Sequence, residues 1–134
     1  MSYSIKPLRK KVIGRPLRII RREYDWVFEF TDGAVLSVAT MWRMRSAKLI
    51  LVTDADDRQL FGLPAPVDAE HQANEIVADA VAKSLRFDEA TGDLRIAMSN
   101  RVILEILTNS GGYESWQANA GAELLAVAGN GGLR

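Results

Sequence analysis

An alternation of apolar and polar residues occurs twice along the chain, 68 positions apart, and it constrains the fold more than any other feature. Asp32-Gly33 interrupts the first occurrence and Asn100-Arg101 interrupts the second. Apolar residues at every second position predict strands that bury one face. An Asp-Gly pair between two such runs predicts a hairpin with a tight primed turn. The corresponding apolar positions are Trp26, Phe28, Phe30, Leu36 and Val38 in the first half and Leu94, Ile96, Met98, Leu104 and Ile106 in the second.

The two turns differ in one residue, because Arg101 stands where the first turn has Gly33. A primed turn requires a positive φ at both of its central residues. An arginine in that conformation costs on the order of 1 kcal/mol. We therefore expect the second hairpin to use a different turn.

The correspondence continues upstream of the hairpins. Residues 14–17 align with residues 78–81 at a spacing of 64, so the second half has four extra residues before its hairpin. They fall in 88–93, a predicted loop in which Gly92 supplies a positive φ. The predicted fold class is α+β: a mainly antiparallel β-sheet built from two copies of a short helix plus β-meander unit, with pseudo-two-fold symmetry. We expect one domain over 1–134, with the repeats at 6–53 and 68–127.

The elements expected within each unit follow from local signals. Helices are predicted over 6–12 and 68–77, the second with Asp68 as its N-cap. Residues 61–66 (Phe-Gly-Leu-Pro-Ala-Pro) form the best internal linker. Strands are predicted over 15–23, 26–31, 34–41, 47–53, 80–88, 93–98, 101–108, 113–118 and 122–127.

Composition sets the class of protein. Apolar residues make up 48% and charged residues 25% of the 134 residues, which is ordinary globular usage with enough apolar surface for one core. The absence of Cys excludes disulfides, thiolate metal sites and cysteine nucleophiles. No apolar run approaches the roughly 20 residues that span a bilayer, and the N-terminus lacks the apolar core of a signal peptide. We expect a cytoplasmic protein with no membrane contact.

Charge is neutral in total but unevenly distributed. Residues 1–58 hold twelve basic and seven acidic residues, and residues 59–134 hold five basic and ten acidic residues. Such asymmetry indicates a polyanion site, two halves whose charges meet in the fold or in a dimer, or a solvated basic face. Eight basic residues without an acidic one occupy the first 22 positions: Lys6, Arg9, Lys10, Lys11, Arg15, Arg18, Arg21 and Arg22.

Candidate catalytic and metal-binding groups are few. The only histidine, His71, has Glu75 one helical turn later, but two ligands make a poor metal site, so a solvent-facing pair is the expectation. Asp54, Asp56 and Asp57 resemble a calcium loop, yet Arg58 and Gln59 occupy positions that should be a ligand and a glycine, so a polar turn is expected. We therefore predict no metal, no cofactor and no enzymatic activity.

Two aromatic segments are candidates for partner binding. On a strand, Glu114 and Trp116 share one face, with Tyr113 on the other. Trp116 then either fills the core while Glu114 pairs with an arginine such as Arg95, or the aromatic residues anchor a partner. The second segment, residues 41–45 (Met-Trp-Arg-Met-Arg), is an adaptable contact surface or a strand with its Trp and Met inside.

The strand predicted around Glu105 is apolar on both faces, since Leu104 and Ile106 line one face and Ile103 and Leu107 the other. A strand of this kind lies centrally in a sheet and is covered on both sides. The pattern favours association into a homodimer.

Residues 78–132 resemble a family of small bacterial proteins of unknown function. The resemblance is carried by Val81, by Thr91-Gly92-Asp93-Leu94, by Leu104-Glu105-Ile106, by Gly112-Tyr113-Glu114-Ser115-Trp116 and by Gly129-Asn130-Gly131-Gly132. The chain departs from the family at Ala78, where a glycine is usual, and in the terminal turn, which lacks a proline. The resemblance implies a protein like those encoded near bacterial toxins, in the manner of immunity proteins.

Three functions follow as expectations. The first is a non-enzymatic binding protein that neutralises a toxin by direct contact, because inhibition needs no catalytic residue; its partner-binding residues are Asp88, Glu89, Asp93, Tyr113, Glu114 and Trp116. The second is a homo-oligomeric structural or regulatory module. The third, which the neutral net charge disfavours, is nucleic-acid binding through the basic residues of 1–22, with bases stacked on the aromatic residues of 24–30.

Overall fold

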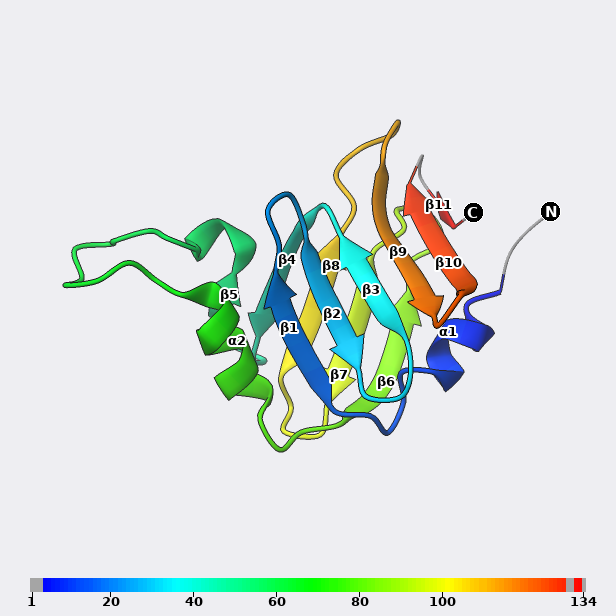
Figure 1. The fold of residues 1–134 in the computed structure, drawn as a ribbon, viewed down its shortest axis with the longest axis horizontal. Coiled ribbons are helices and arrows are strands. Elements are labelled where there is room, and N and C mark those ends of the chain that lie inside the picture. The colour runs from blue at the N-terminus through cyan, green and yellow to red at the C-terminus, as the bar shows by residue number, and fades with distance from the viewer. Residues whose placement is uncertain (1–3, 130–131, 134) are drawn as a thin grey trace.

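A computed structural model describes residues 4–129 and 132–133 and consists mostly of antiparallel β-sheet with few helices, consistent with the α+β class (Figure 1). One sheet has the strand order β1-β2-β3-β9-β10-β11, and the other has the order β5-β4-β8-β7-β6. The first sheet contains β1 (Leu17–Arg21), β2 (Trp26–Phe30), β3 (Val35–Val38), β9 (Glu114–Ala120), β10 (Glu123–Gly129) and β11 (Gly132–Leu133). The second contains β4 (Met41–Arg45), β5 (Ile50–Thr53), β6 (Ala82–Phe87), β7 (Leu94–Met98) and β8 (Ile103–Leu107).

Alternate residues of the strands build one core between the two sheets. Phe28 from β2 and Ile96 from β7 are fully buried in it, as the period-two pattern predicts. Their cross-strand partners are Leu36 and Leu104, in hairpins of the same register. Edge-to-face contacts of Trp42 with Trp26 and Phe28 add directional packing to the area that these rings bury.

The turns of the two hairpins are not the predicted two-residue primed turn. Both connections have three residues, because Phe30 N–H donates to the oxygen of Ala34 and Met98 N–H to that of Val102. The left-handed residue is Asp32 (φ 55°) in the first turn and Arg101 (φ 71°) in the second. The two turns thus differ, as expected. The second nevertheless places Arg101 at a positive φ, the conformation that was expected to be too costly for an arginine.

Strand β4 was predicted only in part, as the inward–outward alternation of residues 41–45. A single strand over 34–41 is wrong, because the chain turns at Ala39-Thr40 and passes from one sheet to the other. The buried Thr40 hydroxyl holds this corner by donating to the oxygen of Leu107 at 2.5 Å. β4 then pairs with β8, which lies in the centre of its sheet as its two apolar faces predict.

Helices and loop segments cover two of the four sheet edges, those of β1 and β6. Helix α2 (Ala69–Val77), capped by Asp68 as predicted, satisfies the edge of β1 through Asn74 and Glu70. β11 pairs with the edge of β10. The edge of β6 exchanges backbone hydrogen bonds with residues 14–15 and accepts one from the side chain of Arg9, which lies in helix α1 (Lys6–Lys10). At the fourth edge β5 pairs with β4 alone, and a 3-10 helix, η1 (Asp54–Asp56), follows it.

Candidate functional site

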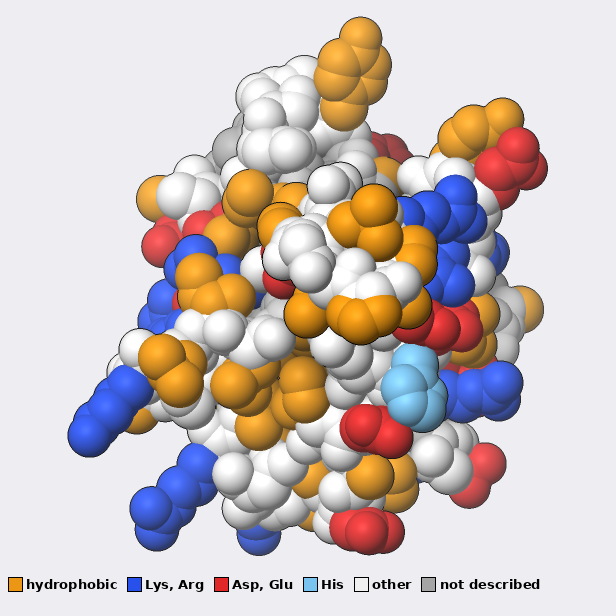
Figure 2. All heavy atoms as spheres, turned by 90° about the vertical axis from the view of Figure 1, so that its left-hand side faces the viewer, with side chains coloured by type: hydrophobic (Ala, Val, Ile, Leu, Met, Phe, Trp, Pro, Cys, Tyr) orange, Lys and Arg blue, Asp and Glu red, His pale blue; other side chains and the backbone are white. Residues whose placement is uncertain are grey.

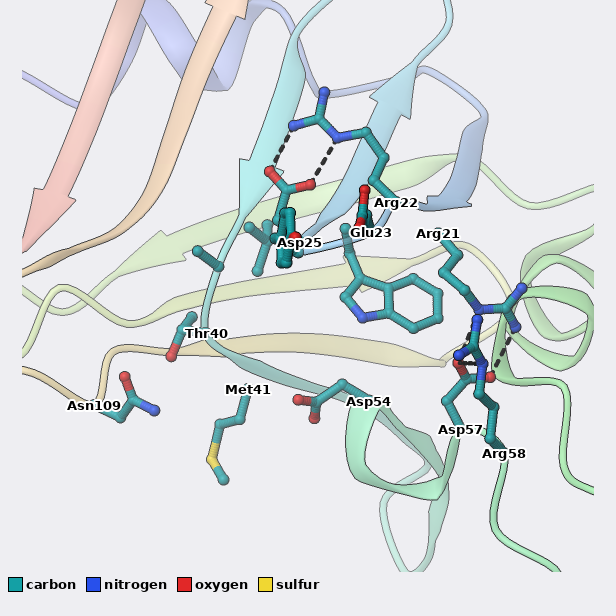
Figure 3. A pocket seen from close by; sticks show the side chains of 14 residues that line it. Arg21, Arg22, Glu23, Asp25, Thr40, Met41, Asp54, Asp57, Arg58 and Asn109 are labelled. Atoms are coloured by element: carbon teal, nitrogen blue, oxygen red, sulfur yellow. Dashed lines mark hydrogen bonds and ion pairs between the residues drawn. The ribbon is translucent and has the colours of Figure 1, made fainter.

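A cleft with a volume of about 670 Å³ lies where the β1–β2 turn, the β3–β4 corner and η1 meet (Figure 3). Its walls carry both signs of charge, and Trp26, Tyr24 and Met41 add an apolar rim. Tyr24 is 88% exposed and thus makes almost no packing contact. The charged residues that line the cleft are Arg21, Arg22, Glu23, Asp25, Asp54, Asp57 and Arg58.

Ion pairs neutralise the two inner arginines of the cleft. Arg21 donates to Asp57 at 2.7 Å and to Asp68 at 2.8 Å. The hydrogen bond from Arg21 is the main reason that the pKa of Asp57 lies below its ordinary value. Arg22 forms a two-pronged pair with Asp25, at 2.7 and 2.5 Å, on the opposite side of the cleft. Neither guanidinium is free to recruit an anion.

Asp54 is the exception, because its carboxylate makes no ion pair with any residue that the structure describes. One oxygen accepts a 3.3 Å hydrogen bond from the backbone N–H of Trp42. Partial burial raises the pKa of Asp54, and the backbone hydrogen bonds only partly offset this. Glu23 also lacks an ion pair among the described residues, but it is exposed, so Asp54 is the part-buried negative charge of the cleft that the fold leaves without a counter-charge.

A projecting arm, residues 58–67, begins at the edge of the cleft and extends away from both sheets (Figure 1). Backbone hydrogen bonds join its two sides, from Arg58 N–H to the oxygen of Val67 and from Val67 N–H to that of Gln59, both 2.8 Å. Figure 2 looks onto this side of the molecule, where apolar side chains gather on the arm. The exposed apolar residues of the arm are Leu60, Phe61 and Leu63.

The tip of the arm is a tight turn with an unusual residue. Leu63 N–H donates to the oxygen of Leu60 at 2.7 Å, and the two residues between them have positive φ, 48° at Phe61 and 74° at Gly62. Positive φ at both central positions defines a type I′ turn, which strongly prefers Asn or Gly. Phe61 is thus a bulky residue in a strained conformation, and it is 65% exposed.

The six residues predicted to bind a partner have different environments. Trp116 is 1% exposed and donates its Nε1–H to the oxygen of Gly92, so it fills the core. The Asp93 carboxylate accepts hydrogen bonds from Thr108, whereas Asp88 and Glu89 lie exposed on the same loop. Tyr113 and Glu114 are exposed, and Arg95 pairs with Glu105 rather than with Glu114. Part of the terminal turn that carries the resemblance, residues 130–131, lies outside the described residues.

The basic N-terminal segment does not form one patch. Arg9 and Arg15 donate to backbone oxygens, Arg21 and Arg22 are paired with carboxylates, and Arg18 lies on the outer face of β1. Phe28 and Phe30 are buried, so they cannot stack on bases. The segment is therefore distributed over the fold rather than arranged along one groove.

The remaining sequence candidates are structural. His71 and Glu75 form an exposed pair at 3.0 Å on α2, as expected. The carboxylates of residues 54–57 hold the turn: Asp56 and Thr53 form a reciprocal cap of η1. Across residues 4–129 and 132–133, no three His, Cys, Asp or Glu side chains are grouped so that they could share a metal ion. None of the described helices is long and apolar enough to cross a membrane.

Sequence reasoning missed both the arm and the cleft. Residues 61–66 were predicted to be a linker, and the available signal was the presence of Leu60, Phe61 and Leu63 in a segment that should be polar. No local pattern in the sequence predicts the cleft, since it forms from three segments that are separate in the chain.

Comparison with known proteins identifies no relative: no protein-family model, no curated protein and no solved structure matches the chain.

Proposed function

We propose that the protein is a non-enzymatic binding protein that holds another protein with its arm and the adjoining cleft. The observation that carries this proposal is Phe61, exposed at the tip of the arm with φ 48°. A left-handed conformation costs a side chain with a Cβ roughly 1–2 kcal/mol. Folding gains little from Phe61 in return, because its ring lies outside the core and is 65% exposed. Strain of this kind at an exposed site supports a role in binding.

The chemistry of the surface favours a protein as the partner. Leu60, Phe61 and Leu63 on the arm, with Tyr24 and Met41 on the cleft rim, are apolar or aromatic residues of the kind that anchor interfaces. The unpaired carboxylate of Asp54 in the cleft complements a lysine or arginine side chain. A partner that inserts a basic residue beside a surface of apolar residues fits both features.

A toxin is the partner class that we propose first. The resemblance of residues 78–132 to proteins encoded near bacterial toxins suggests it, and neutralisation requires only that the toxin surface be covered. The unpaired Asp54 and the exposed Asp88 and Glu89 would attract a basic toxin over a distance.

We further propose that the two halves are copies of one unit. On this scheme β1 to β5 correspond, in order, to β6 to β10. Replacing each strand in the order β1-β2-β3-β9-β10 by its counterpart gives β6-β7-β8-β4-β5. This is the order of the second sheet read backwards. The exchange also relates the pairs Val38–Trp116 and Ile106–Trp42. On this scheme the cleft includes the β1–β2 turn of the first copy, which is shorter than the corresponding β6–β7 turn of the second copy. A solved relative with only one half would test the scheme.

The test of partner binding uses two substitutions at one position. Phe61→Asn suits the turn and removes the ring, whereas Phe61→Tyr keeps the ring. We expect Phe61→Asn to fold with unchanged or higher stability. Its affinity for a toxin encoded beside the gene of this protein, as measured by calorimetry, should fall at least about tenfold. Phe61→Tyr should bind the toxin with the affinity of the natural protein. Equal binding by all three proteins would refute the role of the arm, and the absence of any binding to that toxin would refute the partner class.

A homo-oligomeric module is the second candidate, favoured by the open edge of β5. The strand carries exposed Ile50 and Leu51, and an unpaired apolar edge is a template for strand addition. Antiparallel pairing of two copies about Leu51 would place Lys48 opposite Asp54 of the partner subunit. Sedimentation equilibrium of the natural protein and of Leu51→Pro distinguishes the cases: a dimer that the substitution dissociates supports this function, and a monomer at all concentrations excludes it.

A further inference from the structure

The outer face of the second sheet carries a group of arginines that neither the arm nor the cleft involves. Strand pairing aligns the side chains on this face in two rows that cross β4, β8, β7 and β6. One row is Arg43, Glu105, Arg95 and Arg86, and the next is Arg45, Ile103, Ala97 and Ser84. Three guanidinium groups thus surround the carboxylate of Glu105, and Arg86 lies one strand further along the row.

Glu105 holds three of these arginines in place. Its carboxylate accepts from Arg43 at 2.8 Å, from Arg45 at 2.7 Å and from Arg95 at 2.9 Å, and it is only 1% exposed. One negative charge therefore orients three positive charges, each of which keeps further N–H donors directed away from Glu105. Preorganised donors of this kind bind an anion without a further ordering cost.

Arg86 is the fourth cation, and it has no acidic partner. It lies directly opposite Arg95 in the β6–β7 pair. Like charges in such a pair destabilise a sheet unless a counter-charge is present. Arg86 makes no ion pair within 4.0 Å among the residues that the structure describes. With Arg95 it also lines a neighbouring hollow that includes Asp88 and Asp93. An anion between Arg86 and Arg95 would relieve this repulsion.

A hollow of about 280 Å³ lies beside these arginines. Its walls are Arg45, Arg86, Arg95 and Ser84, and its floor is Ala97 and Ile103. The short side chain of Ala97, between longer neighbours, creates the depression. Guanidinium groups bind phosphate oxygens in pairs, the hydroxyl of Ser84 supplies another donor, and the apolar floor fits a small organic group.

We propose that this hollow is a binding site for the phosphate group of a small phosphate monoester, whose organic part rests on Ile103 and Ala97. The charge of the site, three guanidiniums without a carboxylate in its walls, selects an anion. Its volume lies at the lower end of small-molecule sites, which favours a compact ligand. The site is independent of the proposed protein-binding arm.

Phenyl phosphate is the probe, titrated into the ¹⁵N-labelled full chain with amide shifts as the readout. We expect saturable shifts confined to β4, β6, β7 and β8, and a loss of at least about tenfold in affinity for Arg86→Gln, because one charge-assisted contact disappears. Arg18→Gln is the matched control: Arg18 is an exposed strand arginine on the other sheet, and the substitution should leave binding unchanged.

Three results would overturn the proposal. The first is the absence of saturable shifts, and the second is equal affinity of the Arg86→Gln and Arg18→Gln variants. The third is tighter binding of a single-stranded oligonucleotide than of phenyl phosphate with the same Arg86 dependence, which would assign the face to a phosphodiester chain. Inorganic phosphate, tested alongside, should bind more weakly than phenyl phosphate, and equal affinity would contradict the role of the apolar floor.

Discussion

The indole Nε1–H of Trp116 donates a 2.9 Å hydrogen bond to the carbonyl oxygen of Gly92, inside the core. Trp42 is equally buried, yet its Nε1 has no hydrogen-bond partner in the part of the chain that the structure describes. Leaving a buried donor unsatisfied costs about 1–3 kcal/mol, whereas a satisfied one contributes about 1 kcal/mol. Two tryptophans in similar strand positions therefore make unequal contributions to stability.

The matched pair Trp42→Phe and Trp116→Phe measures this difference. Both substitutions remove the same atoms from the core, so their cavity costs are comparable. We expect Trp116→Phe to lower the free energy of unfolding by about 2 kcal/mol more than Trp42→Phe, because it alone breaks a hydrogen bond. Urea unfolding followed by circular dichroism gives both values. Equal losses would mean that Trp42 Nε1–H is satisfied in solution, for example by water.

Acid should destabilise the protein through Glu105. Burial alone would raise its pKa, but the hydrogen bonds from Arg45, Arg43 and Arg95 outweigh burial and lower the pKa from 4.5 to about 2. A lowered carboxylate pKa adds stability above the unfolded-state pKa, and this stability is lost as pH falls through the folded-state value. We expect a loss of about 3 kcal/mol between pH 5 and pH 2 from this residue.

Glu105→Gln provides the control for the acid effect. At pH 7 the variant should be less stable by roughly 2–4 kcal/mol, because three arginines lose their common acceptor charge. Its stability should then depend much less on pH between 5 and 2 than that of the natural protein, as measured by urea midpoints in that range. An unchanged pH slope would assign acid sensitivity to other carboxylates.

Arg101 offers a stabilising substitution. It is exposed, and its φ of 71° is strained for a residue with a Cβ. Arg101→Gly should raise the free energy of unfolding by about 1 kcal/mol, since glycine adopts this conformation at little steric cost, although part of the gain is lost to the greater freedom of the unfolded chain. Arg101→Ala keeps the strain and should bring no gain. Thermal unfolding of the pair checks this, and a stabilised alanine variant would show that the arginine charge, not φ, is responsible.

The core strands could be predicted because their information is local. Phe28 and Ile96 each lie in an alternating run, and burial of one sheet face makes that alternation visible in the sequence. The corner before β4 escaped prediction because Ala39-Thr40 contains no turn residue, and its direction is fixed by a contact of Thr40 with the distant Leu107. The first hairpin turn was mispredicted because the strand register, rather than the Asp-Gly pair, sets the loop length.

The candidate site was harder to predict from the sequence than the core strands. The cleft depends on Asp54 and Trp26 being brought together by tertiary packing, and neither residue has a distinctive local pattern. Proline and glycine in the arm are consistent with a linker, and the strained φ of Phe61, which the sequence does not reveal, supports the other interpretation. Sites assembled from separate loops carry no periodic signal.

Asp54 allows the cost of an unpaired charge in the cleft to be measured. Because burial raises its pKa, the folded protein binds a proton at Asp54 more readily than the unfolded chain does. Its ionisation thus lowers stability as pH rises through the unfolded-state and then the folded-state pKa. Asp54→Asn keeps an oxygen that can accept from Trp42 N–H, so at pH 7 the variant should be more stable than the natural protein.

The gain should disappear at a pH below the ordinary range of aspartate, where the natural residue is protonated as well. Urea unfolding of both proteins at neutral and acidic pH decides the matter, with Asp56→Asn as the control that breaks the η1 cap and should only destabilise. A natural protein that is more stable than Asp54→Asn at neutral pH would show that Asp54 has a counter-charge in solution. A stabilised variant that binds the partner less well would show that the carboxylate is kept for binding at the expense of stability.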